Sequence, residues 1–356
     1  MHLINKIVTK FATRRLCYIA RMAVVFLVLV TTIQPSHTQS EDTFYAGKQI
    51  SLLIGLGPGG VNDVWARLLS RYITKHIPGR PNVIPQNMPG AGGLKLALHL
   101  FGAAPKDGTV FGLINRGIPL EPLFGNRAAQ FDPMTMNWIG SPDKDITVCA
   151  ARKDAEVQTI GDLFTKQLVV GATGSGADTA IYPEFLAELL DMKFKIVKGY
   201  SGSNEVLLAM ERNEVQGICV AYDSLVRQPM FTTGKINILF QAALEKSPHI
   251  PPTVPVGVEL AKNAAERQVI ELFLSRATLG RPFVAPPGVP DQQVQTLRRA
   301  FDATMKDAEF IAEAKKAGLT VDAMTGETLA QTIADIYRTP KDVVNRVSET
   351  LGRVSK

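Results

Sequence analysis

The chain has 356 residues, of which 46% are hydrophobic and 20% charged, a composition typical of folded proteins and a length sufficient for two domains. Three cysteines are too few for a fold held together by disulfides. The formal net charge of +6 would favour nucleic acid or an anionic membrane as partner, but the excess of basic residues lies in the N-terminal segment.

Residues 1–38 have the pattern of a secretory signal peptide. Five basic and no acidic residues accompany an apolar run at 22–30, and Ser36-His37-Thr38 is the expected cleavage site. The run is shorter than the roughly 20 residues that cross a bilayer, so an uncleaved N-terminal anchor is the alternative. Without this segment, 34 basic residues accompany 33 acidic ones, a net charge of +1. We therefore expect no nucleic acid partner.

A β-loop-α alternation begins near residue 49. The apolar run 49–54 predicts a buried strand, and the glycine-rich segment 55–60 follows it. Residues 61–73 place apolar side chains on one helical face, and Asn62 or Asp63 can cap this helix. The further elements predicted in this part are a strand at 83–84, a glycine-rich loop at 87–93, a helix at 94–101 and a strand at 110–114. The alternation indicates an α/β fold with a parallel sheet.

A second unit of the same build follows from about residue 146. Its predicted elements are strands at 146–148, 168–170, 194–197 and 215–220 and helices at 179–190 and 204–213. The glycine-rich loop 171–176 again precedes a helix. The proline-rich runs 247–255 and 282–290 indicate connections, and the chain beyond them is predicted to be helical.

Gly55, Gly57 and Gly60 match the dinucleotide-binding pattern G-x-G-x-x-G between a strand and a helix. That kind of site needs an acidic residue about 20 positions further on, and residues 64–106 contain no Asp or Glu, although Arg80 could serve NADP. The pattern therefore does not favour a dinucleotide. Glycines before a helix N-terminus can still bind a carboxylate or a phosphate through backbone N–H groups. A tight turn without a ligand is the alternative.

The residues do not favour catalysis, a cofactor or a metal. The segment 199–203 nearly fits the serine hydrolase pattern G-x-S-x-G around Ser201, but Ser203 replaces the last glycine and no histidine is suitably placed as a base. The histidines and cysteines beyond residue 38 lack the spacing of metal ligands. Cys149 and Cys219 lie in or beside predicted buried strands, and we expect both to be free thiols.

Three ordered motifs within about 50 residues resemble one family. They are Gly-Gly-Val-Asn-Asp-Val-Trp-Ala-Arg at 59–67, Asn-Met-Pro-Gly-Ala-Gly-Gly at 87–93 and Ala-Pro-Lys-Asp-Gly at 104–108. Further matches are the loop 171–176, Tyr-Ser-Gly at 200–202 and the proline-containing runs 251–254 and 284–290. The chain resembles, over residues 48–350, the Bug receptors, which are the periplasmic solute-binding proteins of tripartite tricarboxylate transporters.

The resemblance implies a two-domain periplasmic-binding-protein fold of the venus-flytrap kind, type II-like, with parallel-rich sheets flanked by helices. Domain 1 is expected to comprise residues 44–147 and 256–356 and domain 2 residues 148–255, with the ligand cleft between them. It implies a periplasmic monomer that binds a small carboxylate without catalysis and serves a two-component membrane permease. A receptor that senses its ligand for a membrane signalling partner and an exported α/β enzyme are the alternatives.

The resemblance also assigns the binding residues. Backbone N–H groups of the loops 57–63 and 173–177 are expected to hold one carboxylate, which a bulky residue at Gly59 or Gly92 would block. Arg116 is expected to hold a second carboxylate or another polar end. The expected ligand-binding residues are Gly57, Pro58, Gly59, Gly60, Val61, Asp63, Ala91, Gly92, Asn115, Arg116, Thr173, Gly174, Ser175, Gly176, Ala177, Tyr200 and Asp223.

The chain departs from the family pattern in the distal half of the expected pocket. Ala180 stands where the family often has His, and Ser201 where it often has Lys. The family's usual Asp-Gly aligns with Val220-Ala221, which leaves Asp223 displaced from the matching position. The resemblance therefore does not specify which carboxylate binds.

Overall fold

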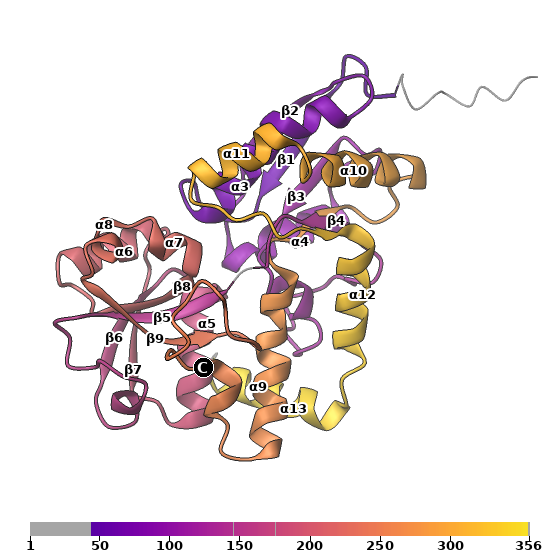
Figure 1. Ribbon diagram of the computed structural model, residues 1–356. Coiled ribbons are helices and arrows are strands. Elements are labelled where there is room, and N and C mark those ends of the chain that lie inside the picture. Colours follow the sequence, from indigo (N-terminus) through magenta and orange to yellow (C-terminus); the bar gives the residue numbers. More distant parts are fainter. Residues whose placement is uncertain (1–43, 145, 175, 355–356) are drawn as a thin grey trace, which may run out of the picture. The chain divides into compact units, whose positions relative to one another are not determined.

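The computed structural model describes residues 44–144, 146–174 and 176–354, which belong to one compact unit (Figure 1). The predicted signal peptide lies outside the described residues. Two β-sheets with flanking helices make up the described part, as the α/β prediction requires. Within these ranges, no helix has both the length and the apolar character needed to cross a bilayer.

The first sheet is mixed rather than wholly parallel. Its strands are β1 (Gln49–Ile54), β2 (Asn82–Asn87), β3 (Val110–Leu113), β4 (Asn137–Ser141), β10 (Phe283–Ala285) and β11 (Met324–Thr325), in the order β11-β4-β10-β3-β1-β2. Strand β1 pairs in parallel with β2 and β3, whereas β10 runs antiparallel between β3 and β4. The run 282–290 is thus more than the predicted connection, because Phe283–Ala285 is fully buried and completes the sheet.

The second sheet is also mixed. Its strands are β5 (Thr147–Arg152), β6 (Leu168–Ala172), β7 (Phe194–Lys198), β8 (Gly217–Ala221) and β9 (Ile236–Ala242), in the order β7-β6-β8-β5-β9. Strand β6 is parallel to β7 and β8, and β5 is antiparallel to β8 and β9. The carboxyl ends of β6 and β8 therefore lie at the edge of the sheet where β5 begins.

The helices follow from amphipathic runs with clear ends. They are α3 (Val61–Tyr72), α4 (Leu94–Gly102), α5 (Asp178–Leu190), α6 (Ser203–Glu211), α7 (Tyr222–Val226), α8 (Pro229–Thr232), α9 (Ala264–Leu274), α10 (Asp291–Thr304), α11 (Ala308–Lys316), α12 (Gly326–Tyr337) and α13 (Lys341–Val354). Asp307 caps α11 by accepting the N–H of Glu309 at 2.9 Å, and Gly318 ends it with a φ of 71°.

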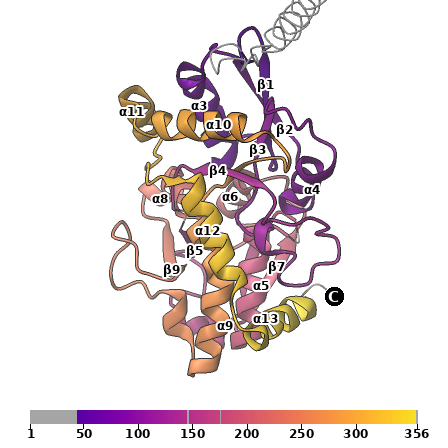
Figure 2. The same ribbon diagram turned by 90° about the vertical axis from the view of Figure 1, so that its right-hand side faces the viewer.

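The C-terminal tail packs against a helix that follows a strand of the second sheet. Helices α5, α9 and α13 contact one another (Figure 2), and the rings of Phe185 in α5 and Phe273 in α9 stack with centroids 3.7 Å apart. Aromatic stacking of this kind adds about 0.5–1.5 kcal/mol to the burial of the rings. The tail therefore supports the helix that borders the candidate site described below.

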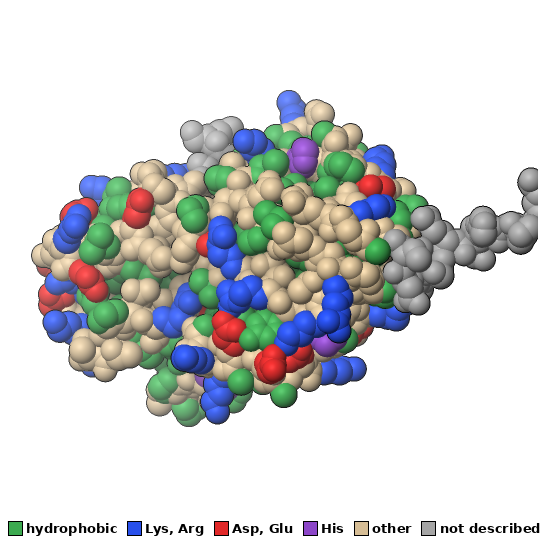
Figure 3. All heavy atoms as spheres, turned by 90° about the horizontal axis from the view of Figure 1, so that it is seen from above, with side chains coloured by type: hydrophobic (Ala, Val, Ile, Leu, Met, Phe, Trp, Pro, Cys, Tyr) green, Lys and Arg blue, Asp and Glu red, His purple; other side chains and the backbone are tan. Residues whose placement is uncertain are grey.

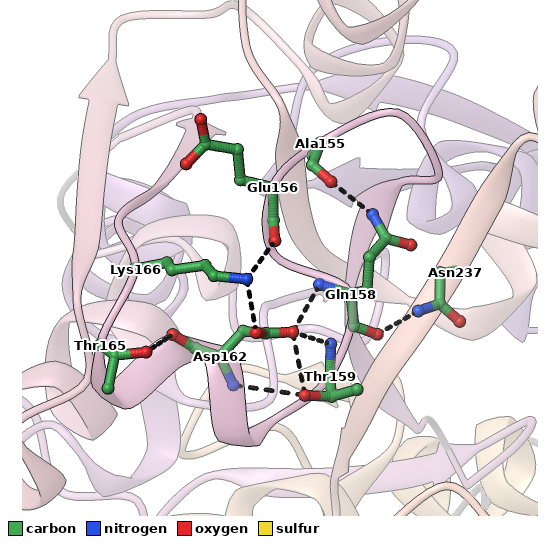
Figure 4. Close-up of polar contacts among 8 residues, drawn as sticks. All are labelled: Ala155, Glu156, Gln158, Thr159, Asp162, Thr165, Lys166 and Asn237. Carbon is green, nitrogen blue, oxygen red and sulfur yellow. Dashed lines mark hydrogen bonds and ion pairs between the residues drawn. The ribbon is translucent and has the colours of Figure 1, made fainter.

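The loop between β5 and β6 is fastened by one carboxylate (Figure 4). Asp162 accepts hydrogen bonds from Lys166 Nζ at 2.9 Å and from the backbone N–H groups of Gln158 and Thr159. The hydrogen bond from Lys166 and those from the two N–H groups hold the pKa of Asp162 well below its usual value. Asn237 of β9 donates to the carbonyl of Gln158, so this loop is tied to the edge of the sheet.

The expectation of two free thiols is wrong. Cys149 of β5 and Cys219 of β8 form a disulfide, and they are direct partners in the antiparallel register, with Cα atoms 4.0 Å apart. Residues directly opposite each other on antiparallel strands have Cα atoms close enough for a disulfide to join their side chains. The prediction failed because the pairing of β5 with β8 is set by tertiary structure, since 70 residues separate the two cysteines.

We expect reduction of this disulfide to destabilise the protein. A bridge that closes a loop of 70 residues contributes about 4 kcal/mol in the chain-entropy model. Urea unfolding with and without dithiothreitol measures the difference, and peptide mass mapping without reductant should find residues 149 and 219 in one linked peptide pair. Two alkylated cysteines at these positions under non-reducing conditions would contradict the prediction.

Candidate functional site

A cavity of about 130 Å³ lies between the glycine-rich ends of the two sheets. Loops and helix starts that follow β1, β3, β6, β7 and β8 supply its walls. Its lining residues are Leu56, Gly57, Pro58, Gly60, Val61, Asn62, Asn115, Arg116, Thr173, Ala177, Asp178, Thr179, Ser201, Gly202, Ser203, Asn204, Val220, Ala221 and Ser224. Ligands of α/β proteins commonly bind at such carboxyl ends of strands.

The first glycine-rich loop is held in shape by Asp63, which is 4% exposed. One carboxylate oxygen accepts the N–H of Gly59, and the other accepts Nδ2 of Asn87, each at 2.9 Å. Arg67 Nε donates to both oxygens at 2.9 Å, and its guanidinium also donates to Asn87 Oδ1 at 2.7 Å. Asn87 Nδ2 reaches Leu56 O at 2.9 Å. The first two family motifs thus form one polar network.

This network decides how α3 begins. The N-cap residue is Gly60, so neither Asn62 nor Asp63 caps the helix as expected, and no side chain accepts from its first turn. Asp63 instead reaches back from the third helical position to the N–H of Gly59. The N–H groups of Val61 and Asn62 have no intrahelical partner by helix geometry and border the cavity. They are the donors that an anion would find here.

The pKa of Asp63 is lowered. Burial alone would raise it, but the hydrogen bonds from Arg67, Gly59 and Asn87 to the charged form outweigh burial. The carboxylate is therefore fully ionised at neutral pH and acts as a fixed acceptor for the loop.

The second glycine-rich loop offers fewer donors than expected. The N–H of Thr173 donates to Thr179 Oγ1 at 3.0 Å, and the N–H of Ala177 donates to Gly174 O at 2.9 Å. Ser175 lies outside the described residues. Among the described residues of this loop and of the helix that follows it, the donors left at the cavity are the N–H groups of the first turn of α5, at Asp178 and Thr179.

Arg116 is 3% exposed and is already engaged. Its Nε donates to Asp178 Oδ2 at 2.9 Å, and its Nη2 lies 2.8 Å from the same oxygen and also donates to Thr147 Oγ1. The expected partner, a second carboxylate of the ligand, would therefore compete with Asp178. Arg116 follows β3 of the first sheet and binds residues of α5 and of β5, which belongs to the second sheet. It therefore connects the two sides of the cavity.

A second buried arginine was missed in the sequence. Arg281 is 1% exposed, forms an ion pair with Asp143 and donates from Nε to Asn62 Oδ1 at 2.9 Å. Burial lowers its pKa, and the charge of Arg116 adds to this effect. Arg281 thus orients Asn62, a lining residue. No local sequence pattern predicts this contact, because 219 positions separate Arg281 from Asn62.

Glycines bring the two sides of the cavity into contact. A Cβ atom at Gly92 would lie 2.5 Å from the carbonyl carbon of Gly176, and one at Gly57 would lie 3.3 Å from Ser201 O. Asn204 Nδ2 donates to Gly59 O at 2.8 Å. Gly92 therefore permits close contact between two protein loops, while the expected approach of a ligand to its backbone stays a prediction.

The structure brings about half of the expected residues to the cavity. The lining residues among them are Gly57, Pro58, Gly60, Val61, Asn115, Arg116, Thr173 and Ala177. The expected residues that do not line it are Gly59, Asp63, Ala91, Gly92, Gly174, Gly176, Tyr200 and Asp223. Gly59 and Asp63 belong to the Asp63 network. Ala91, Gly92, Gly174 and Gly176 belong to the loops that meet across the cavity. Tyr200 packs on the Gly171 side of β6, and Asp223 borders a separate cavity of about 570 Å³.

Asp178, Thr179 and Ser224 line the cavity but were not expected to. Asp178 and Thr179 directly follow the expected loop 173–177 and are the first two residues of α5. The helix was expected to begin at residue 179. An expected start at Asp178 would have added these two residues to the expected site as the first turn of the helix. Ser224 lies in α7, a single short helix after β8, and carried no motif. Among the described residues there is no cluster of His, Cys, Asp and Glu side chains that could hold a metal ion.

We expect Asp63→Asn to lower the free energy of unfolding by about 2 kcal/mol at pH 7, because the amide cannot accept all four donations. The pKa of Asp63 is lowered by folding, so its contribution is complete above the unfolded pKa of about 4 and is lost as the pH falls through the lower folded value. Urea unfolding of both proteins should therefore give a smaller difference at pH 3 than at pH 7.

The exposed Asp322, 3.5 Å from Lys144, supplies the control, since Asp322→Asn should change stability by less than about 0.5 kcal/mol. A deficit of Asp63→Asn that is equal at the two pH values would contradict the role given to the carboxylate.

Comparison with known proteins places these features in a family. Over 296 residues the chain is 25% identical to a UPF0065 protein of Bordetella pertussis, covering 80% of this chain and 84% of that protein. The structure of the periplasmic binding protein BugD matches with a TM-score of 0.65 and 20% identity, over 87% of this chain and 99% of BugD. MatC of Rhodopseudomonas palustris, solved with bound malate, matches with a TM-score of 0.66 and 21% identity, over 84% and 99%.

The two solved structures share the fold of this chain, and the two-domain binding-protein architecture expected from the motifs is confirmed. Residues 66–348 match the model of the tripartite tricarboxylate transporter family receptors. The match spans most of the described residues and includes all but the first of the glycine-rich loops. The chain belongs to the tripartite tricarboxylate transporter receptor family.

Proposed function

We propose that this protein is a solute-binding receptor that captures a small carboxylate between its two sheets and presents it to a two-component membrane permease. The observation that carries this proposal is the cavity between two glycine-rich loops, each followed by a helix whose first N–H groups border it. MatC, which shares the fold, holds malate. A carboxylate matches such a pair of helix N-termini in charge and in hydrogen bonding.

The proposed mechanism is closure of two lobes over the ligand. The lobes correspond to the domains expected from the sequence, residues 44–147 with 256–356 and residues 148–255. The contacts of Gly92 with Gly176 and of Asn204 with Gly59 are then contacts of the closed state. Closure excludes water, which strengthens each N–H bond to the carboxylate.

The lining residues support binding without turnover. Among the described residues, the lining includes neither histidine nor cysteine, and its two ionisable side chains, Arg116 and Asp178, pair with each other. The face shown in Figure 3 carries basic and acidic side chains interspersed. The mixed charge of this face does not favour nucleic acid as a partner, which supports a small ligand instead. We also propose that the receptor acts as a monomer.

We also propose that the protein is exported to the periplasm with loss of residues 1–38. The pattern of basic residues, apolar run and Ser36-His37-Thr38 supports this. Mass spectrometry of the exported protein should find a new N-terminus between Pro35 and Glu41. An intact Met1 on a membrane-bound product would contradict it.

A thermal-shift screen of mono-, di- and tricarboxylates tests the proposed ligand class. A ligand at 100 times its dissociation constant adds about 2.7 kcal/mol to stability, so binding should raise the melting temperature by several degrees. A screen in which sugars or cationic amino compounds shift the melting temperature and no carboxylate does would contradict the proposal.

Gly92→Ala should abolish the shift given by any carboxylate that binds, because its Cβ would overlap Gly176 and prevent closure. Gly125→Ala is the matched control. Both glycines have a positive φ, 65° and 76°, but a Cβ at Gly125 meets nothing within 4 Å. The control therefore carries the same backbone strain, about 1–2 kcal/mol, and should retain binding. Equal loss of binding in both variants would exclude the role given to closure.

A further inference from the structure

We propose that the cavity selects a small monocarboxylic acid that also carries a hydroxyl or amino group, and that Ser224 and Asp178 bind this second group. The proposal rests on the proposed function and narrows its ligand class. Three independent features carry it: two buried polar atoms without partners, the charge of the lining and the volume of the cavity.

Ser224 supplies the first polar atom. It is 2% exposed, lines the cavity and has no hydrogen-bond partner for its Oγ among the described residues. Buried hydroxyls in native proteins nearly always have a partner, because an unsatisfied one costs about 1–3 kcal/mol. A hydroxyl that faces a ligand cavity can be satisfied by the ligand. Ser224 is therefore assigned to a polar group of the ligand.

Asp178 supplies the second atom and sets the polarity of that group. Its Oδ2 accepts from Arg116, while its Oδ1 is buried and has no hydrogen-bond partner in the described part of the chain. The carboxylate forms an ion pair with Arg116, and a carboxylate in an ion pair only accepts hydrogen bonds. The ligand group that satisfies Oδ1 must therefore donate, as a hydroxyl or an amino group does.

The charge of the lining limits the ligand to one carboxylate. The ionisable lining residues are Arg116 and Asp178, and they form an ion pair. One ligand carboxylate can bind the N–H groups of Val61 and Asn62. A second would lie near the carboxylate of Asp178, and the described lining residues supply no further cation, so like-charge repulsion disfavours it.

The volume sets the size. An apolar protein cavity of about 150 Å³ holds benzene, which has six non-hydrogen atoms. The cavity of about 130 Å³ therefore suits acids with about six non-hydrogen atoms, such as lactate and alanine. Citrate, with thirteen non-hydrogen atoms, exceeds it.

Calorimetric titration of the purified protein with matched acids tests the inference. The probes are both enantiomers of lactate and of alanine, together with propionate, malate and citrate. At least one enantiomer of lactate or alanine should bind about five- to tenfold more tightly than propionate, which lacks only the donor group, and more tightly than malate or citrate.

Ser224→Ala should remove most of this preference and leave propionate affinity unchanged. Since the variant deletes an unsatisfied buried hydroxyl, its melting temperature without ligand should be equal or higher. The control is Ser70→Ala, because Ser70 is also buried, lies outside the cavity and donates to Arg67 O at 2.9 Å. This control should keep the preference and melt at a lower temperature.

Equal affinity for lactate, alanine and propionate, or an unchanged preference in Ser224→Ala, would overturn the inference and leave the proposed function standing. Tighter binding of malate or citrate would overturn it as well. Binding of none of the acids tested, the simple propionate included, would count against the proposed function itself.

Discussion

The carboxylate of Asp63 is the interaction on which the candidate site depends. It draws together the loop after β1, the first turns of α3 and the end of β2 through Gly59, Arg67 and Asn87. Without an acceptor at this point, the loop would lose the shape that leaves the N–H groups of Val61 and Asn62 directed outward. The two family motifs at 59–67 and 87–93 are therefore linked physically, because each supplies part of one buried polar network.

The second constraint is the close approach of backbone across the cavity. Gly92 and Gly57 meet loops that follow strands of the other sheet, and Gly92 has a φ of 65° that residues with a Cβ rarely adopt. These glycines serve the fit between protein segments. In the proposed function, helix N-termini and a few polar side chains of the lining then make the ligand contacts.

Local patterns predicted much of the fold and the glycine-rich loops beside the cavity. The strand 49–54, the helix after it and the glycine-rich loops follow from periodicity and from the backbone freedom of glycine, which are local properties. Strand β10 was not predicted, because Phe283–Ala285 is a short, fully buried run between prolines. Such a run does not show the alternation of apolar and polar residues that indicates a strand. The disulfide, the pairing of Arg281 with Asn62 and the placement of Ser224 depend on residues far apart in the chain. Only tertiary structure brings them together.

The disulfide has a consequence for the cavity that it does not touch. The pairing of β5 with β8 ends where Thr147 lies directly opposite Ala221. In each strand, this end is two residues away from the cysteine. Thr147 accepts from Arg116, and Ala221 lines the cavity. Strand ends usually fray, since local opening costs less free energy there than in the middle of a sheet. A covalent link one pleat away restrains that fraying and so supports the wall of the cavity opposite the first sheet. The redox state of two buried sulfur atoms is thereby linked to the stiffness of one wall of the candidate site.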